Sequence, residues 1–127
     1  MATKIIVLDG NKFDDMDSFY DEVQVMFCPD FSGFGRNLSA LTDVCIGGFG
    51  VFEPNEPVKV VWLNSEKSRK DFSYPAPEGY EERLKEFRAA WKLPEPEPLG
   101  RPMTQFEVLV ECINDETACP NLTLELK

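Results

Sequence analysis

The chain of 127 residues is long enough for one domain with a hydrophobic core, and its apolar fraction of 43% is typical of a globular protein. Its formal net charge of −10, from 23 acidic and 13 basic residues, disfavours direct binding to nucleic acid or to an anionic membrane, because both repel it. The absence of histidine removes the most common general base, so we do not expect an enzyme. The acidic surface suits a basic partner or serves solubility alone.

A strand and a helix are the first predicted elements. Residues 4–8 (KIIVL) form a continuous apolar run that the sequence DGN ends, which is typical of a buried strand followed by a turn. In residues 14–27, the apolar side chains recur with the spacing of a helix, and either Asp15 or Asp17 can cap its start.

A second helix and a second strand follow. Asn37 is a candidate N-cap, the apolar residues after it recur on one helical face, and Gly47 is the natural C-cap. After a long loop rich in Gly and Pro, the run Val58–Leu63 predicts another strand of the buried type.

The next part of the chain predicts helices and a spacer. Residues 64–72 are a short helix or a turn. Residues 80–91 predict an amphipathic helix, whose apolar face carries Tyr80, Leu84, Phe87 and Trp91. The Pro-rich segment LPEPEPLGRP, residues 93–102, favours an extended polyproline spacer.

Thr104 and Glu107 form a capping box that starts a further helix, and the alternating leucines of residues 121–126 predict the last strand. Strands separated by helices favour parallel pairing through right-handed crossovers. We therefore expect an α/β fold, with a small three-stranded parallel sheet packed with helices. Because the last strand must return to the sheet, the Pro-rich segment is a surface excursion, and residues 1–127 form a single domain.

The sequence predicts no targeting segment and no bound cofactor. The N-terminal residues lack a signal-peptide pattern and no apolar run reaches membrane-spanning length, so we expect a cytoplasmic protein. Cys28, Cys45, Cys112 and Cys119 include no C-x-x-C pair, and in a cytoplasmic protein we expect them to be reduced. With that spacing and no histidine, we expect neither a metal site nor another cofactor.

The helix between Asn37 and Gly47 has one acid, Asp43, which lies in its last turn. A negative charge there opposes the negative end of the helix dipole. The residues away from the apolar stripe form a surface strip between two glycine-containing loops: Ser39, Thr42, Asp43 and Ile46. A lone helical aspartate is often only solvated, but locally unfavourable residues tend to lie at functional sites.

The stretch FGRNLSALTDVCIGG, residues 34–48, resembles the signature of the barstar family, which are intracellular inhibitors of the ribonuclease barnase. The matching positions are Phe34, Gly35, Asn37, Leu38, Ala40, Leu41, Asp43 and Gly47. Relative to that family, residues from about 73 to 102 look like an insertion. The resemblance implies a barstar-like fold whose helix and preceding loop plug a ribonuclease active site. Asp43 is then the central acid, which stands in for an RNA phosphate.

Several positions depart from the signature. They are Ser39, at the first acid, and Thr42, Gly33 and Gly48, at aromatic positions. A helix surface with one acid and little aromatic area should bind barnase itself weakly. We therefore expect the partner to be a different basic nuclease or toxin. We expect Phe49 to supply the aromatic contact that the Gly48 position lacks. The resemblance also places an acid of the last helix at Glu116 or Asp115.

We therefore expect an inhibitor of a basic nuclease, in the manner of an immunity protein, that is monomeric when free and needs no cofactor. Its expected partner-binding residues are Asp43, Ser39, Thr42, Asn37, Gly35, Phe34, Gly47, Phe49 and Glu116. The alternative is a non-inhibitory adaptor on the same fold, which uses the Pro-rich insertion as its binding element.

Overall fold

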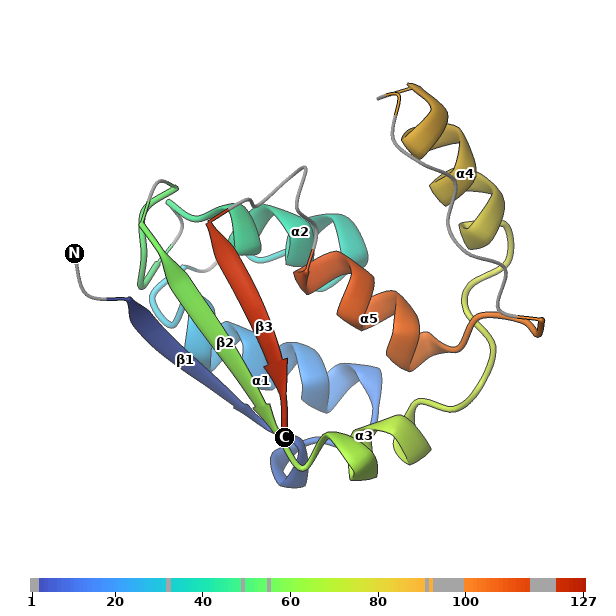
Figure 1. Cartoon of the computed structure of the whole chain (residues 1–127). Helices are drawn as coiled ribbons and strands as arrows, with labels where there is room; N and C mark the ends of the chain where they lie inside the picture. Colours follow the sequence, from blue (N-terminus) through green and yellow to red (C-terminus); the bar gives the residue numbers. More distant parts are fainter. Residues whose placement is uncertain are drawn as a thin grey trace.

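The computed structural model describes residues 3–31, 33–48, 50–54, 56–90, 92, 100–114 and 121–127. Its sheet has three strands in the order β1 (Lys4–Asp9), β2 (Val58–Leu63) and β3 (Leu122–Leu126) (Figure 1). Both pairings are parallel, with Ile6 opposite Val60 and Val60 opposite Leu124. The predicted α/β fold with a three-stranded parallel sheet is confirmed.

Helices connect the strands in the predicted order. They are the 3-10 turn η1 (Gly10–Lys12), α1 (Met16–Phe27), α2 (Leu38–Ile46), α3 (Ser65–Asp71), α4 (Tyr80–Ala90) and α5 (Gln105–Ile113). α1 packs against β1, α5 packs against β3, and α2 lies against both of these helices (Figure 1). Residues 64–72 were predicted as a short helix or a turn, and the structure has a helix there.

Helices cover one face of the sheet, so the first two strands, which were predicted as buried, are buried on that face alone. Side chains alternate along β1 and β2, so that Leu8 and Val60 are buried while Ile5 is 63% exposed. On the open face, an ion pair of 3.0 Å joins Lys59 to Glu125. The apolar runs do not reveal the open face, because α1 and α5 pack on the same side of the sheet (Figure 1).

An aromatic cluster fills the space between the sheet and the helices. Trp62, in β2, is fully buried, and its ring centroid lies 5.7 Å from that of Phe19 in α1 and 5.3 Å from that of Phe106 in α5. The Trp62 indole N–H donates to the Ser68 hydroxyl at 3.0 Å, so its polar atom is satisfied inside the core.

The N-cap of α1 is Asp15, which decides between the two predicted candidates. Its carboxylate accepts a hydrogen bond from the Ser18 backbone N–H at 2.8 Å. The Ser18 hydroxyl accepts in return from the Asp15 backbone N–H at 3.2 Å, so the two residues form a capping box.

Main-chain hydrogen bonds join the segment after α3 to the start of α5, a pairing that the sequence patterns did not predict. The Gln105 N–H donates to the Tyr74 carbonyl at 2.9 Å, and the Ala76 N–H donates to the Met103 carbonyl at 2.8 Å. A β-bridge joins Pro75 to Thr104. The stretch that leads out to α4 and the stretch that returns to α5 are therefore held together at their base.

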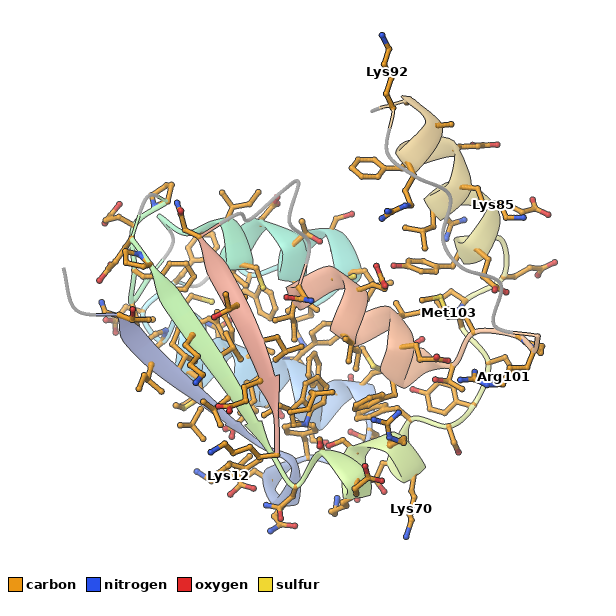
Figure 2. All side chains as sticks on the ribbon, in the orientation of Figure 1. Lys12, Lys70, Lys85, Lys92, Arg101 and Met103 are labelled. Carbon is orange, nitrogen blue, oxygen red and sulfur yellow. The ribbon has the colours of Figure 1, made fainter. Side chains whose placement is uncertain are left out.

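From this base, α4 extends away from the sheet, and Lys92 beyond its end points outward (Figures 1 and 2). No residue of α4 is fully buried; Tyr80 and Leu84 pack against the core, while Phe87 is 39% exposed. The predicted helix is thus present, and Tyr80 and Leu84 of its apolar face pack against the core. Trp91 and the Pro-rich residues 93–99 lie outside the described residues.

The predicted capping box at the start of α5 is present and includes an arginine. Glu107 accepts from the Thr104 backbone N–H at 2.9 Å and from both terminal nitrogens of Arg101, at 2.7 and 3.0 Å. The Arg101 side chain stands beside the start of α5 (Figure 2). These hydrogen bonds, first that of Arg101, lower the pKa of Glu107 to about 2.

We predict that Glu107→Gln lowers the free energy of unfolding at pH 7 by about 1 kcal/mol, because the cap and the Arg101 pair are both weakened. Since the pKa of Glu107 is about 2 when folded and near 4.5 when unfolded, its stabilising effect is complete above about pH 4.5 and is lost as the pH falls toward 2. Chemical denaturation between pH 2 and 7 measures both effects.

The matched control is Glu111→Gln, an exposed acid near the other end of the same helix. It removes the same charge without touching the cap, so the free energy of unfolding should stay level or rise slightly. Equal pH profiles for the two variants would contradict the role given to Glu107.

Candidate functional site

The helix that carries Asp43 begins with the predicted cap. The Asn37 side-chain oxygen accepts from the Ala40 backbone N–H at 2.8 Å, and its amide group donates to the Gly35 carbonyl at 3.3 Å. One side chain therefore closes the helix end and also holds the preceding loop against it.

The exposed strip of α2 is narrower than the sequence suggests. Ser39 and Asp43 are exposed and lie one helical turn apart. Thr42 is half-buried, and its hydroxyl donates to the Leu38 carbonyl at 3.2 Å. The surface of this helix thus presents one acid beside a small neutral side chain.

Asp43 has no counter-charge in the part of the chain that the structure describes. The ion pairs formed there use other acids, and none involves the Asp43 carboxylate. This carboxylate lies in the last turn before Ile46, close to the negative end of the helix. The Asp43 carboxylate and the end of the helix therefore produce a negative potential, which can attract a cation of another protein.

Two glycines end α2, as predicted for its C-cap. Gly47 has φ of +106°, and a Cβ atom there would lie 2.8 Å from the carbonyl carbon of Glu53. Gly48 has φ of +88°, and its N–H donates to the Phe52 carbonyl at 2.8 Å. No other residue fits at Gly47 without moving the backbone, so the loop beside Asp43 has a defined path.

Arg36 is the residue near the site that the sequence analysis missed. It has φ of +53°, and its guanidinium pairs with the Asp21 carboxylate at 2.8 Å and donates to the Asp17 carbonyl at 2.9 Å. These contacts tie the loop before α2 to α1 and give the Arg36 guanidinium a counter-charge within the protein. A positive φ at a non-glycine residue and a partner 15 positions away leave no signal in a sequence pattern.

The same loop is anchored by Phe34, which we predicted as a partner-binding residue. Its side chain is buried, and its ring meets that of Tyr20 edge to face, with 5.9 Å between centroids. Burial raises the pKa of Tyr20 to about 12, so its phenol stays neutral at the foot of the loop. In the free protein, the Phe34 ring positions the loop and does not lie on the surface.

The structure brings six of the expected site residues onto or next to α2. They are Gly35, Asn37, Ser39, Thr42, Asp43 and Gly47. Phe49 and Glu116 lie outside the described residues, as does Asp115. The described residues contain no group of three or more acids or cysteines that could hold a metal ion, and none of their helices is long and apolar enough to cross a membrane.

Comparison with known proteins identifies a family. Residues 3–111 match the model of the family described as Barstar (barnase inhibitor), which spans most of the chain and includes both α2 and the first two strands. A search of curated proteins found no match. The chain therefore belongs to the barstar family, whose members are ribonuclease inhibitors and not enzymes.

Proposed function

We propose that this member of the barstar family inhibits a basic nuclease by placing α2 and its flanking loops in the active site of the enzyme. The observation that carries the proposal is Asp43, an exposed acid in the last turn of a helix that has no cation beside it in the described structure. An enzyme that cleaves nucleic acid binds phosphates, so its active site presents cations. The Asp43 carboxylate occupies the place of a phosphate there.

Binding to a cation removes the energetic cost of placing Asp43 at the negative end of the helix. In the free protein, Asp43 opposes the helix dipole, which costs a few tenths of a kcal/mol up to about 1 kcal/mol. A cation from the partner interacts favourably with both the carboxylate and the helix end. The net charge of −10 adds long-range attraction for a basic enzyme.

The surroundings of Asp43 fit a close approach by another protein. Ser39 is small and exposed on the same side of the helix, and Gly47 and Gly48 follow without bulky side chains. Asn37 and Gly35 hold the preceding loop in place through their hydrogen bond. Phe49 and Glu116 stay predicted contacts at the edges of this surface.

The partner that this surface fits is a basic nuclease or toxin other than barnase. With Ser39 and Thr42 in place of an acid and an aromatic residue, the surface offers one strong electrostatic contact. We propose that the protein acts in the cytoplasm as an immunity protein that protects its own cell, as a monomer until it meets the enzyme. A plug of this kind requires no metal and no other cofactor.

We predict that Asp43→Asn weakens binding to barnase, used as the probe enzyme, by about 2–5 kcal/mol, or at least roughly thirty-fold, because a cation of the enzyme stays desolvated without its pair. The free energy of unfolding should stay level or rise by up to about 1 kcal/mol, since the charge opposes the helix dipole. Calorimetric titration at low salt and thermal unfolding measure the two quantities.

The control for this variant is Glu66→Gln, whose side chain is 81% exposed. It belongs to α3, a helix that lies away from α2 (Figure 1). It makes the same charge change and should leave binding within about twofold. An adaptor that binds through the Pro-rich insertion would tolerate both variants equally. Reduced stability with unchanged binding would show that Asp43 is structural.

A gain of function is expected from Ser39→Asp. The residue is the second of α2, where a negative charge favours the positive helix end, so the free energy of unfolding should rise by about 0.3–1 kcal/mol. The variant also restores the first acid of the barstar signature and should tighten binding to barnase, measured as inhibition of RNA hydrolysis. Ser39→Asn, which adds similar bulk without charge, should do neither. Inhibition by Ser39→Asp that is no stronger than inhibition by wild type or by Ser39→Asn would contradict the role given to this face of α2.

A further inference from the structure

A groove opens beside the N-terminus of α2, with a hollow of about 560 Å³. Its lining includes Ser39 of α2 together with Tyr74 and Pro77, from the stretch between α3 and α4. Met16 and Tyr20 of α1 also line it. The hollow is shallow and wide open to solvent, and its volume leaves room for one large side chain to rest against its lining.

The wall that contains Tyr74 is held in place by main-chain contacts. The Tyr74 carbonyl accepts from the Gln105 N–H at 2.9 Å, and the next two residues pair with Thr104 and Met103. Met103 marks this pairing at the entry to α5 (Figure 2). The groove therefore exists before any partner arrives, which lowers the entropy lost on binding.

The chemistry of the groove favours an aromatic side chain. Met16, Tyr74 and Pro77 present a thioether, an aromatic ring and an aliphatic ring, which are good contacts for another ring. The charged lining residue, Arg36, already pairs with Asp21 at 2.8 Å. An anion would therefore have to compete with an existing ion pair, whereas an aromatic ring would not.

The groove is also continuous with the surface proposed to block the nuclease. Ser39 lines the groove and lies one helical turn from Asp43. Ser39, Thr42 and Asp43 supply no aromatic contact, although aromatic residues dominate the energetics of most protein interfaces. Tyr74, which also lines the groove and is 44% exposed, supplies one.

We propose that the groove receives an aromatic side chain from a loop of the same nuclease whose active site α2 blocks, and that Tyr74 is a specificity-determining contact. This inference rests on the proposed function, because a partner that covers Asp43 also covers the mouth of the groove. Charge on α2 then selects a basic enzyme, and the groove selects among basic enzymes by shape.

The first test uses a small probe and no nuclease. In two-dimensional NMR spectra of the full chain, N-acetyl-tryptophan amide should shift the amide signals of residues around the groove in a saturable manner, and N-acetyl-alanine amide should not. Tyr74→Ala should abolish these shifts, and Tyr74→Phe should retain them because the ring remains. Shifts that are absent, or that are scattered over the surface, would overturn the proposal.

The second test measures binding to barnase as the probe nuclease. Tyr74→Ala should weaken binding about thirty-fold, as expected for truncation of an interface hot spot, and Tyr74→Phe should bind within about threefold of wild type. The control is Val25→Ala, a truncation at a side chain of α1 that is 60% exposed and does not line the groove. Thermal unfolding of each variant verifies that the fold is retained.

The outcomes separate this inference from the proposed function. If Asp43→Asn weakens binding while Tyr74→Ala behaves like Val25→Ala, the inference is wrong and the inhibitor function stands. If Asp43→Asn has no effect on binding, the proposed function is wrong. The groove is then not occupied by a nuclease loop either. Self-association of wild type in sedimentation, abolished by Tyr74→Ala, would identify a second copy of the chain as the occupant and would also overturn the inference.

Discussion

The burial of Trp62 is the constraint on which the positions of the other elements depend. This residue is near the end of the central strand, and rings from the stretch after η1, from α1 and from α5 pack around it, with centroids 5.3–5.8 Å from its own. Its indole N–H is satisfied by Ser68 of α3, so four separate parts of the chain meet at one side chain. Because α2 lies against α1 and α5, the same cluster determines which way the acid of α2 faces.

Features that depend on local chemistry could be predicted from the sequence, and features that depend on distant contacts could not. The caps at Asn37 and Thr104 were predictable because the side chain and the backbone groups that it binds are within three residues. The open face of the sheet was not, since Ile5 belongs to an apolar run that looks the same in a strand buried on both faces. The pairing of Tyr74 with Gln105 depends on the arrangement of α3 and α5, which no local pattern contains.

Some residues of the candidate site could likewise be placed from the sequence, and others could not. Helical spacing was sufficient to place Asp43 on the exposed side of α2, because one buried stripe determines the opposite face. It was not sufficient for Phe34, whose ring is in the core, or for Thr42, whose hydroxyl bonds within its own helix. An aromatic or hydroxyl residue in a signature does not reveal whether it contacts a partner or supports a residue that does.

Two locally unfavourable features flank or lie in α2. A positive φ at Arg36 precedes the helix, an acid opposes its dipole at Asp43, and a glycine with φ of +106° follows it. The strained backbone at Arg36 costs about 1–3 kcal/mol and the misplaced charge up to about 1 kcal/mol, whereas glycine adopts a positive φ without strain; burial of the aromatic cluster offsets these costs. A surface held in this way can be changed residue by residue without loss of the fold. On the proposal made above, charge recognition lies on α2 and shape recognition lies partly on Tyr74 in another segment, so either can change while the other is retained.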